Sequence, residues 1–245
     1  MRIVCLVPSW TETLIECGVN VVGRTRYCVH PADRVASLPV VGGTKDVQWS
    51  KVAALAPDMV IFDKEENTRK MAETCPFPYF ATEVKSVPGM PQALEQLAQV
   101  LDCEALQQLS YRYRAVLGRT SACTPEALPL LPDDQASDLS VLDEKRPWIY
   151  LIWRKPYMTV GKDTFIHSLF AHLGHQLLTP GDRYPVVDEA WLRQHNPVLL
   201  CSSEPYPFAG KLEQTREELK LDAVLIDGEP LCWYDIRSLR YLESI

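Results

Sequence analysis

Aromatic and basic side chains stand at the ends of several predicted strands, and their chemistry suits a large, flat, partly apolar ligand. Parallel sheets place their ligand crevices at strand ends. Arg154 and Lys155, in IWRKPYM, can pair with carboxylates or phosphate on such a ligand. The rings at these positions are Trp10, Tyr27, Trp153, Tyr157, Tyr184, Tyr206, Phe208, Trp233 and Tyr234. As a group they predict a cleft for a macrocycle or chelate, although any single ring can equally fill the core.

Other residue patterns point to no metal centre and no catalytic residue. His167 and His172 are five residues apart, which does not match ligand spacing on a helix, and Gly174 separates His172 from His175. The chain has no GxSxG, GxxxxGK[ST] or HExxH motif.

One enzymatic alternative stays open. Asp63, Lys64 and Glu65 follow a predicted strand and, facing Arg154 and Lys155, would form an acid–base set. The enzyme would act in the cytosol on a tetrapyrrole or metal chelate held in the same cleft. Surface ion pairs in a solvated loop are the simpler interpretation of these residues.

Composition narrows the class of protein. The chain has 245 residues, a net charge of −7, and 47% hydrophobic and 23% charged residues, as expected of a folded globular protein. A pI near 5.3 without a basic run argues against nucleic-acid binding. No apolar run approaches the roughly 20 residues that cross a bilayer, so we expect no membrane span.

Apolar strands alternate with amphipathic helices, which predicts an α/β fold of two Rossmann-like lobes with mostly parallel sheets. The first lobe is expected over 1–88, and residues 24–47 are expected to be irregular. Apolar residues at helical spacing predict one continuous helix from Met90 to about Leu117, within a connecting segment 89–118. An exposed connection, 119–146, and a second lobe, 147–245, complete the architecture. A ligand would bind between the lobes.

The sequence resembles a known family along nearly its whole length. The stretches RIVCLVPSWTETLIECGV, VVGRTRYCVHPA, VGGTKDVQWSKVAALAPDMVI and YLIWRKPYMTVGKDTFIHSLFAHLG, with SSEPYPF and WYDIRSLRYL, are similar to the cobalamin- and iron-chelate-binding proteins of ABC importers. These are the class III periplasmic binding proteins, whose two α/β lobes are linked by a long backbone helix.

The resemblance implies a non-catalytic protein that binds cobalamin, haem or a ferric siderophore and needs no cofactor of its own. It assigns the pocket to Tyr27, the Tyr157 region, Tyr184 and Trp233–Tyr234, with Trp10, Trp153 and Tyr206 nearby. In the family one acidic residue per lobe docks the importer permease. Glu189 matches the second-lobe position, and Glu65 or Glu66 matches the first. We expect a monomer.

Location is predicted from the first residues and the cysteines. The first apolar run, Ile3–Val7, is shorter than the apolar region of a signal peptide and is needed as a core strand. Eight cysteines without a CxxC pair suit reduced thiols. Both features predict a cytoplasmic protein, whereas a missing leader would make it periplasmic and restore the importer partner.

Overall fold

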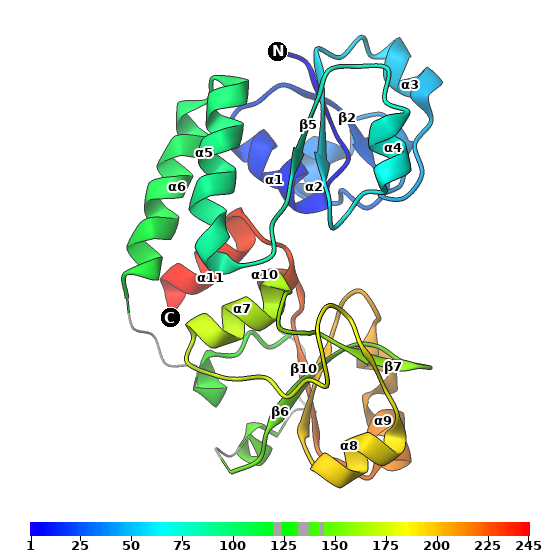
Figure 1. Cartoon of the computed structure of the whole chain (residues 1–245), viewed down its shortest axis with the longest axis vertical. Helices are drawn as coiled ribbons and strands as arrows, with labels where there is room; N and C mark the ends of the chain where they lie inside the picture. The colour runs from blue at the N-terminus through cyan, green and yellow to red at the C-terminus, as the bar shows by residue number, and fades with distance from the viewer. Residues whose placement is uncertain (120–123, 132–137, 143–144) are drawn as a thin grey trace. The chain divides into compact units, whose positions relative to one another are not determined.

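The structure is a computed structural model that describes residues 1–119, 124–131, 138–142 and 145–245. These residues form two compact units. Unit 1 comprises Met1–Gly118 and Trp233–Leu239, and unit 2 comprises Arg119–Cys232 and Arg240–Ile245. Each unit contains one five-stranded sheet with flanking helices (Figure 1). The prediction of an α/β fold with two lobes is confirmed.

The sheet of unit 1 is wholly parallel and has the order β3-β2-β1-β4-β5. The central strand β1 is fully buried, and Ile3 pairs with Val21 on one side and Met59 on the other. A strand covered on both faces must be apolar throughout, which explains the uninterrupted apolar sequence of β1. The strands are β1 (Ile3–Cys5), β2 (Val21–Thr25), β3 (Val40–Gly42), β4 (Met59–Asp63) and β5 (Tyr79–Thr82).

Short helices connect these strands. The first begins with a proline at its first position, where the missing N–H costs no hydrogen bond. The helices are α1 (Pro8–Glu16), α2 (Ala32–Val35), α3 (Trp49–Ala54) and α4 (Arg69–Glu73). The expectation that 24–47 is irregular is therefore wrong in part. Strand β3 and helix α2 lie there, and both are too short to produce a clear periodicity.

The predicted continuous helix over 90–117 is also wrong. The segment forms two helices, α5 (Met90–Leu101) and α6 (Glu104–Leu117), which lie side by side in Figure 1 and pack against each other. Asp102 has φ 49° and ψ 53°, and Cys103 is extended. Asp is among the few residues other than Gly that adopt a left-handed conformation readily, so the break needs neither Pro nor Gly.

A segment near the C-terminus completes unit 1. The Tyr113 hydroxyl donates to the carbonyl of Asp235 at 2.6 Å, and the Ile236 amide donates to Thr13 Oγ1 at 3.3 Å. The buried Glu12 carboxylate accepts from Arg237 Nε at 2.5 Å. These contacts hold residues 233–239 against α1 and α6. The residues belong to helix α11 (Ile236–Ser244) and the turn before it.

The sheet of unit 2 is mixed and has the order β10-β9-β6-β7-β8. Strands β6, β9 and β10 are parallel, whereas β7 and β8 run antiparallel to their neighbours. Strands β7 and β8 have only three and two residues and were not expected from the sequence. The strands are β6 (Trp148–Trp153), β7 (Tyr157–Thr159), β8 (Val186–Val187), β9 (Val198–Ser202) and β10 (Ala223–Ile226).

Helices alternate with the strands of unit 2 as expected from the sequence, and a further helix of four residues follows β10. Thr164 caps α7 by accepting from the His167 amide, and Asp188 caps α8 by accepting from the Trp191 amide at 2.7 Å. The helices are α7 (Phe165–His172), α8 (Glu189–His195), α9 (Leu212–Leu219) and α10 (Glu229–Cys232).

The connection over 119–146 is only partly described, because residues 120–123, 132–137 and 143–144 lie outside the described residues. Its described part contains two 3-10 turns, Pro125–Ala127 and Leu139–Val141. Leu128 and Leu142 are buried, and the Tyr241 hydroxyl donates to the Ala127 carbonyl at 3.1 Å. The prediction that this connection is exposed is wrong for these residues.

Candidate functional site

The carboxyl edge of the unit 1 sheet carries a chain of side-chain hydrogen bonds. Trp10 Nε1, near the start of α1, donates to Thr82 Oγ1 at 2.8 Å, and Thr82 Oγ1 donates to Asp63 Oδ2 at 2.6 Å. All three residues are buried. Burial raises the pKa of Asp63, against the lowering effect of the bonds from Thr82 and the Glu65 amide. The indole of Trp10 is thus engaged inside unit 1.

Two residues of the C-terminal segment join this edge. The ring of Tyr234 meets Trp10 edge-to-face at 5.7 Å, and both rings are buried. Asp235 is buried, and neither oxygen of its carboxylate has a hydrogen-bond partner within the described part of the chain. Its pKa is raised well above the ordinary value, first by burial and then by the charges of Asp63 and Glu12.

The predicted ring with the most accessible surface in unit 1 is Tyr27, which follows β2 and is 52% exposed. The guanidinium of Arg26 lies 5.3 Å from its ring centre and forms a salt bridge of 2.7 Å with Asp46. Trp233 is half-buried, meets His30 edge-to-face at 5.3 Å and lies under the guanidinium of Arg237 at 5.6 Å.

The turn after β4 positions the two candidate docking acids of this unit. Lys45 Nζ donates to the backbone carbonyl of Glu65 at 3.1 Å, and the Glu65 amide donates to Asp63 Oδ1. Burial raises the pKa of Glu66, although the charge of Lys45 opposes the shift. Glu66 is therefore the poorer candidate for an ion pair with a partner. Lys64, assigned above to an acid–base set, instead pairs with Glu83 at 2.8 Å.

The carboxyl end of β6 in unit 2 brings four predicted residues together. Trp153 is 42% exposed, and its ring meets the half-buried ring of Tyr206 edge-to-face at 5.5 Å. Arg154 is buried and pairs with Glu218 at 2.7 Å. The Tyr157 hydroxyl donates to the same carboxylate at 3.2 Å. We call the set Trp153, Arg154, Tyr157, Tyr206 and Glu218 the β6-end cluster.

Electrostatics inside the β6-end cluster favour its charged form. Hydrogen bonds from Arg154, Lys155 and Tyr157 hold the pKa of Glu218 below its ordinary value despite the opposing effect of desolvation. Arg154 Nε is buried and has no hydrogen-bond partner among the residues that the structure describes. The cluster therefore combines an exposed indole with a buried arginine that Glu218 holds in place.

Tyr184 and Glu189 lie elsewhere in unit 2. Tyr184 is 41% exposed, precedes β8 and is covered on one face by the Arg183 guanidinium at 5.7 Å. Glu189 is exposed at the first turn of α8 and pairs with Arg193 one turn later at 2.6 Å.

Three residues that interact with the predicted side chains at the carboxyl edges of the two sheets were not predicted. Thr82, Asp235 and Glu218 complete the contacts of Trp10, Tyr234 and Arg154. Glu218 follows Arg154 by 64 residues, and no local pattern signals such a pairing. Over the described ranges, no group of three or more His, Cys, Asp or Glu side chains has the geometry to hold a metal ion. The same ranges contain no helix long and apolar enough to span a membrane.

Comparison with known proteins identifies the family. The family model described as periplasmic binding protein matches residues 3–181. The chain belongs to the periplasmic binding protein family. The resemblance to this family inferred from the sequence is thus confirmed. The family's name refers to the periplasm, so the comparison does not support the cytoplasmic prediction, and the periplasmic alternative fits.

Solved structures of this family share the fold. The vitamin B12-binding protein BtuF of Vibrio cholerae is 18% identical with a TM-score of 0.74, over 99% of this chain and 94% of that one. The haem-binding protein RhuT of Roseiflexus sp. RS-1 is 17% identical with a TM-score of 0.76, over 99% and 95%. An ABC transporter substrate-binding protein of Listeria monocytogenes is 14% identical with a TM-score of 0.70, over 99% and 96%. No curated protein sequence matches the chain.

Proposed function

We propose that this protein is the substrate-binding component for a large metal chelate of the corrinoid, haem or ferric-siderophore class. The observation that carries the proposal is the β6-end cluster, where an exposed indole and a buried arginine stand at the carboxyl end of one strand. Neighbours in fold include a vitamin B12-binding protein and haem-binding proteins, which supports this ligand class.

Trp153 and Tyr206 would supply apolar contact, and Arg154 would supply charge. Each 100 Å² of apolar surface that a ring buries against a macrocycle contributes about 2.5 kcal/mol. A carboxylate on the ligand would pair with the exposed ammonium group of Lys155, beside the buried Arg154. Haem propionates and siderophore carboxylates have this chemistry.

The remaining predicted residues divide by exposure. Tyr27 and Tyr184 are exposed and Trp233 is half-buried, so we propose these three rings as further contacts with the ligand. Trp10, Tyr157 and Tyr234 are buried and would act by holding the edges in shape. We propose that the protein touches the periphery of the chelate and leaves the ligands of its metal in place.

Titration with haem, cobalamin, cobinamide and ferric siderophores tests this proposal. Tryptophan fluorescence and the absorption spectrum of each chelate are recorded in parallel, with free tryptophan as the control for inner-filter loss. The expected result is saturable quenching at one ligand per chain for at least one class. An absence of saturable binding to every class would refute the proposal.

We further propose that an ABC-importer permease is the protein partner and that Glu65 and Glu189 dock it, one from each lobe of a monomer. Glu65 follows the end of β4 and is half-buried, and Glu189 follows the end of β8 and is exposed. Coexpression with a permease followed by pull-down tests the assignment. Loss of capture in Glu65→Ala with Glu189→Ala, and retention in Glu73→Ala, is expected. Full capture by the double variant would contradict it.

The periplasm is the proposed location. Cys5, Cys28 and Cys201 are buried out of reach of external thiols, so they would resist mispairing in an oxidising compartment. Fractionation of the native host decides the question, and recovery with a cytosolic marker would contradict the proposal. The enzymatic alternative gains no support, because Asp63 is buried and Lys64 is paired with Glu83.

A further inference from the structure

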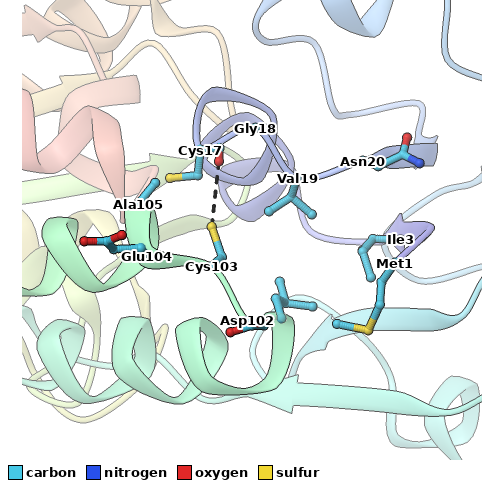
Figure 2. A pocket seen from close by; sticks show the side chains of 11 residues that line it. Met1, Ile3, Cys17, Gly18, Val19, Asn20, Asp102, Cys103, Glu104 and Ala105 are labelled. Atoms are coloured by element: carbon cyan, nitrogen blue, oxygen red, sulfur yellow. Dashed lines mark hydrogen bonds between the residues drawn. The ribbon is translucent and has the colours of Figure 1, made fainter.

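A pocket of about 410 Å³ opens at the amino edge of the unit 1 sheet, opposite to the residues discussed above (Figure 2). Met1 and Ile3 contribute from the start of β1, and Cys17–Asn20 contribute from the end of α1. The turn between α5 and α6, residues Leu101–Ala105, forms the remaining wall. Because Ile3 and Asn20 stand at the amino ends of parallel strands, this pocket is separate from the carboxyl-edge network.

Two cysteines from distant parts of the chain meet in this pocket. Cys103 Sγ donates to the backbone carbonyl of Cys17 at 3.7 Å, although 86 residues separate them. Figure 2 shows both sulfur atoms on the same side of the pocket. Burial first, and then the proximity of Cys103, raise the pKa of the Cys17 thiol to about 12. The two thiols are therefore neighbours in space.

Both cysteines lie at the end of a helix. Cys17 caps the C-terminus of α1 with φ −77° and ψ 4°, and Cys103 precedes α6 with φ −124° and ψ 103°. The Cys17 amide donates to the Thr13 carbonyl and the Cys103 amide donates to the Ala98 carbonyl, each at 2.9 Å, and neither bond involves a cysteine side chain. A disulfide requires Cα atoms about 4.4–6.8 Å apart. The contact between Cys103 Sγ and the Cys17 carbonyl brings the two residues close to one another.

Access distinguishes this pair from a second one. Cys5 and Cys28 also interact electrostatically, but both are fully buried in unit 1. Cys17 and Cys103 are half-buried and line an open pocket that a small oxidant can enter.

We propose that Cys17 and Cys103 form a disulfide by exchange with a small or protein disulfide, such as oxidised glutathione. One thiolate attacks the oxidant, forms a mixed disulfide and releases one reduced thiol. The second thiolate then attacks the protein sulfur of the mixed disulfide and releases the other reduced thiol. The protein loses two electrons and two protons, and the oxidant gains them. The inference does not depend on the ligand proposed above.

The bond would fasten the turn between α5 and α6 to the end of α1. Cross-links that close long loops remove the most conformational freedom from the unfolded chain. The oxidised protein is therefore expected to melt on the order of 10 °C higher than the reduced protein. The α5–α6 hairpin is the part of unit 1 that gains the new anchor.

The experiment treats the purified full-length chain with oxidised glutathione, blocks free thiols by alkylation and maps peptides under non-reducing conditions. The expected product is a single peptide pair joined through Cys17 and Cys103, lighter than the two reduced peptides by two hydrogen atoms and separated by dithiothreitol. Cys103→Ser and Cys17→Ser each abolish the cross-link and the gain in melting temperature. Cys75→Ser, a half-buried cysteine elsewhere in unit 1, retains both.

Any other pattern overturns the inference. Separate glutathione adducts on Cys17 and Cys103, alkylation of both after oxidation, or pairing of either with another cysteine would each do so. Peptide mapping of the wild-type chain is decisive by itself, so a serine variant that fails to fold does not weaken the test.

Discussion

The carboxyl edges of the two sheets hold aromatic and charged residues of the same types but use them differently. In unit 1, Trp10 and Tyr234 are buried and linked to Thr82, Asp63 and Asp235. In unit 2, Trp153 is exposed beside a fixed arginine. The same kind of sequence signal thus marks a structural network at one edge and an accessible surface at the other. Burial, which sequence spacing does not encode, separates the two.

The sharpest way to test this contrast is to remove one indole from each edge. Trp10→Ala is expected to lower the free energy of unfolding by about 3–5 kcal/mol, because it opens a cavity and removes the donor to Thr82. Trp153→Ala should cost less than about 1 kcal/mol, since its ring is already partly in water. Urea denaturation measures both values. Equal losses would show that the two edges do not differ as described.

The buried carboxyl of Asp235 predicts an unusual dependence of stability on pH. Its pKa in the folded chain is raised above the ordinary value near 3.8, so between these two values the folded state binds more protons than the unfolded state. Its contribution is fully present below pH 4 and is lost as the pH rises through the raised pKa. The charges that face it are Asp63 and Glu12.

Asp235→Asn mimics the protonated acid and tolerates the positive φ of 86° at this position. We expect the variant to match the wild type near pH 4 and to exceed it by about 1–2 kcal/mol at pH 7. Urea denaturation across pH 4–8 measures the difference. Asp33→Asn, on the exposed surface of α2, should keep the wild-type dependence because Asp235 is still present. A destabilised Asp235→Asn at pH 7 would contradict the assignment.

Removing the partner of Arg154 tests the order of the β6-end cluster. Glu218→Gln is expected to lower the melting temperature by about 3–6 °C, because the buried guanidinium loses its charged acceptor and Tyr157 loses an anionic one. The exposed neighbour Glu217→Gln on the same helix serves as the control. Differential scanning calorimetry of both variants decides. Identical melting would mean that Glu218 does not hold Arg154 in place.

The sequence predicted the alternation of strands and helices because a buried parallel strand is a run of apolar residues, as in β1 and the first four residues of β4. It failed at elements of two or three residues, such as β3 and β8, which are too short to show a period. The prediction of one continuous helix also failed at Asp102. The apolar residues keep their helical spacing on both sides of Asp102, although the left-handed backbone of this residue ends the first helix.

For the candidate site, the sequence located the strand ends but did not show whether each side chain is buried or exposed. Trp10 and Trp153 look alike in sequence, yet one is buried and one is exposed. The partners that decide these states come from distant positions, as with Thr82 for Trp10 and Glu218 for Arg154. Such pairings depend on the complete fold.

The smallest effect on stability is expected at the proposed docking acid of unit 2. Glu189→Ala should change the free energy of unfolding by less than about 0.5 kcal/mol, because its pairing with Arg193 is an exposed contact one helical turn apart. Urea denaturation is the measurement. A loss above about 1 kcal/mol would assign Glu189 a structural role and weaken its assignment to partner docking.

The most direct test of ligand recognition at the β6-end cluster compares two exposed aromatic residues. Trp153→Ala and Tyr111→Ala remove rings of similar exposure, one from this cluster and one from α6. The chelate bound best by the wild type is titrated against each variant by isothermal calorimetry. For Trp153→Ala we expect a dissociation constant at least tenfold higher than that of the wild type, equivalent to about 1.4 kcal/mol. For Tyr111→Ala we expect wild-type affinity. Equal affinity of the two variants would contradict this prediction.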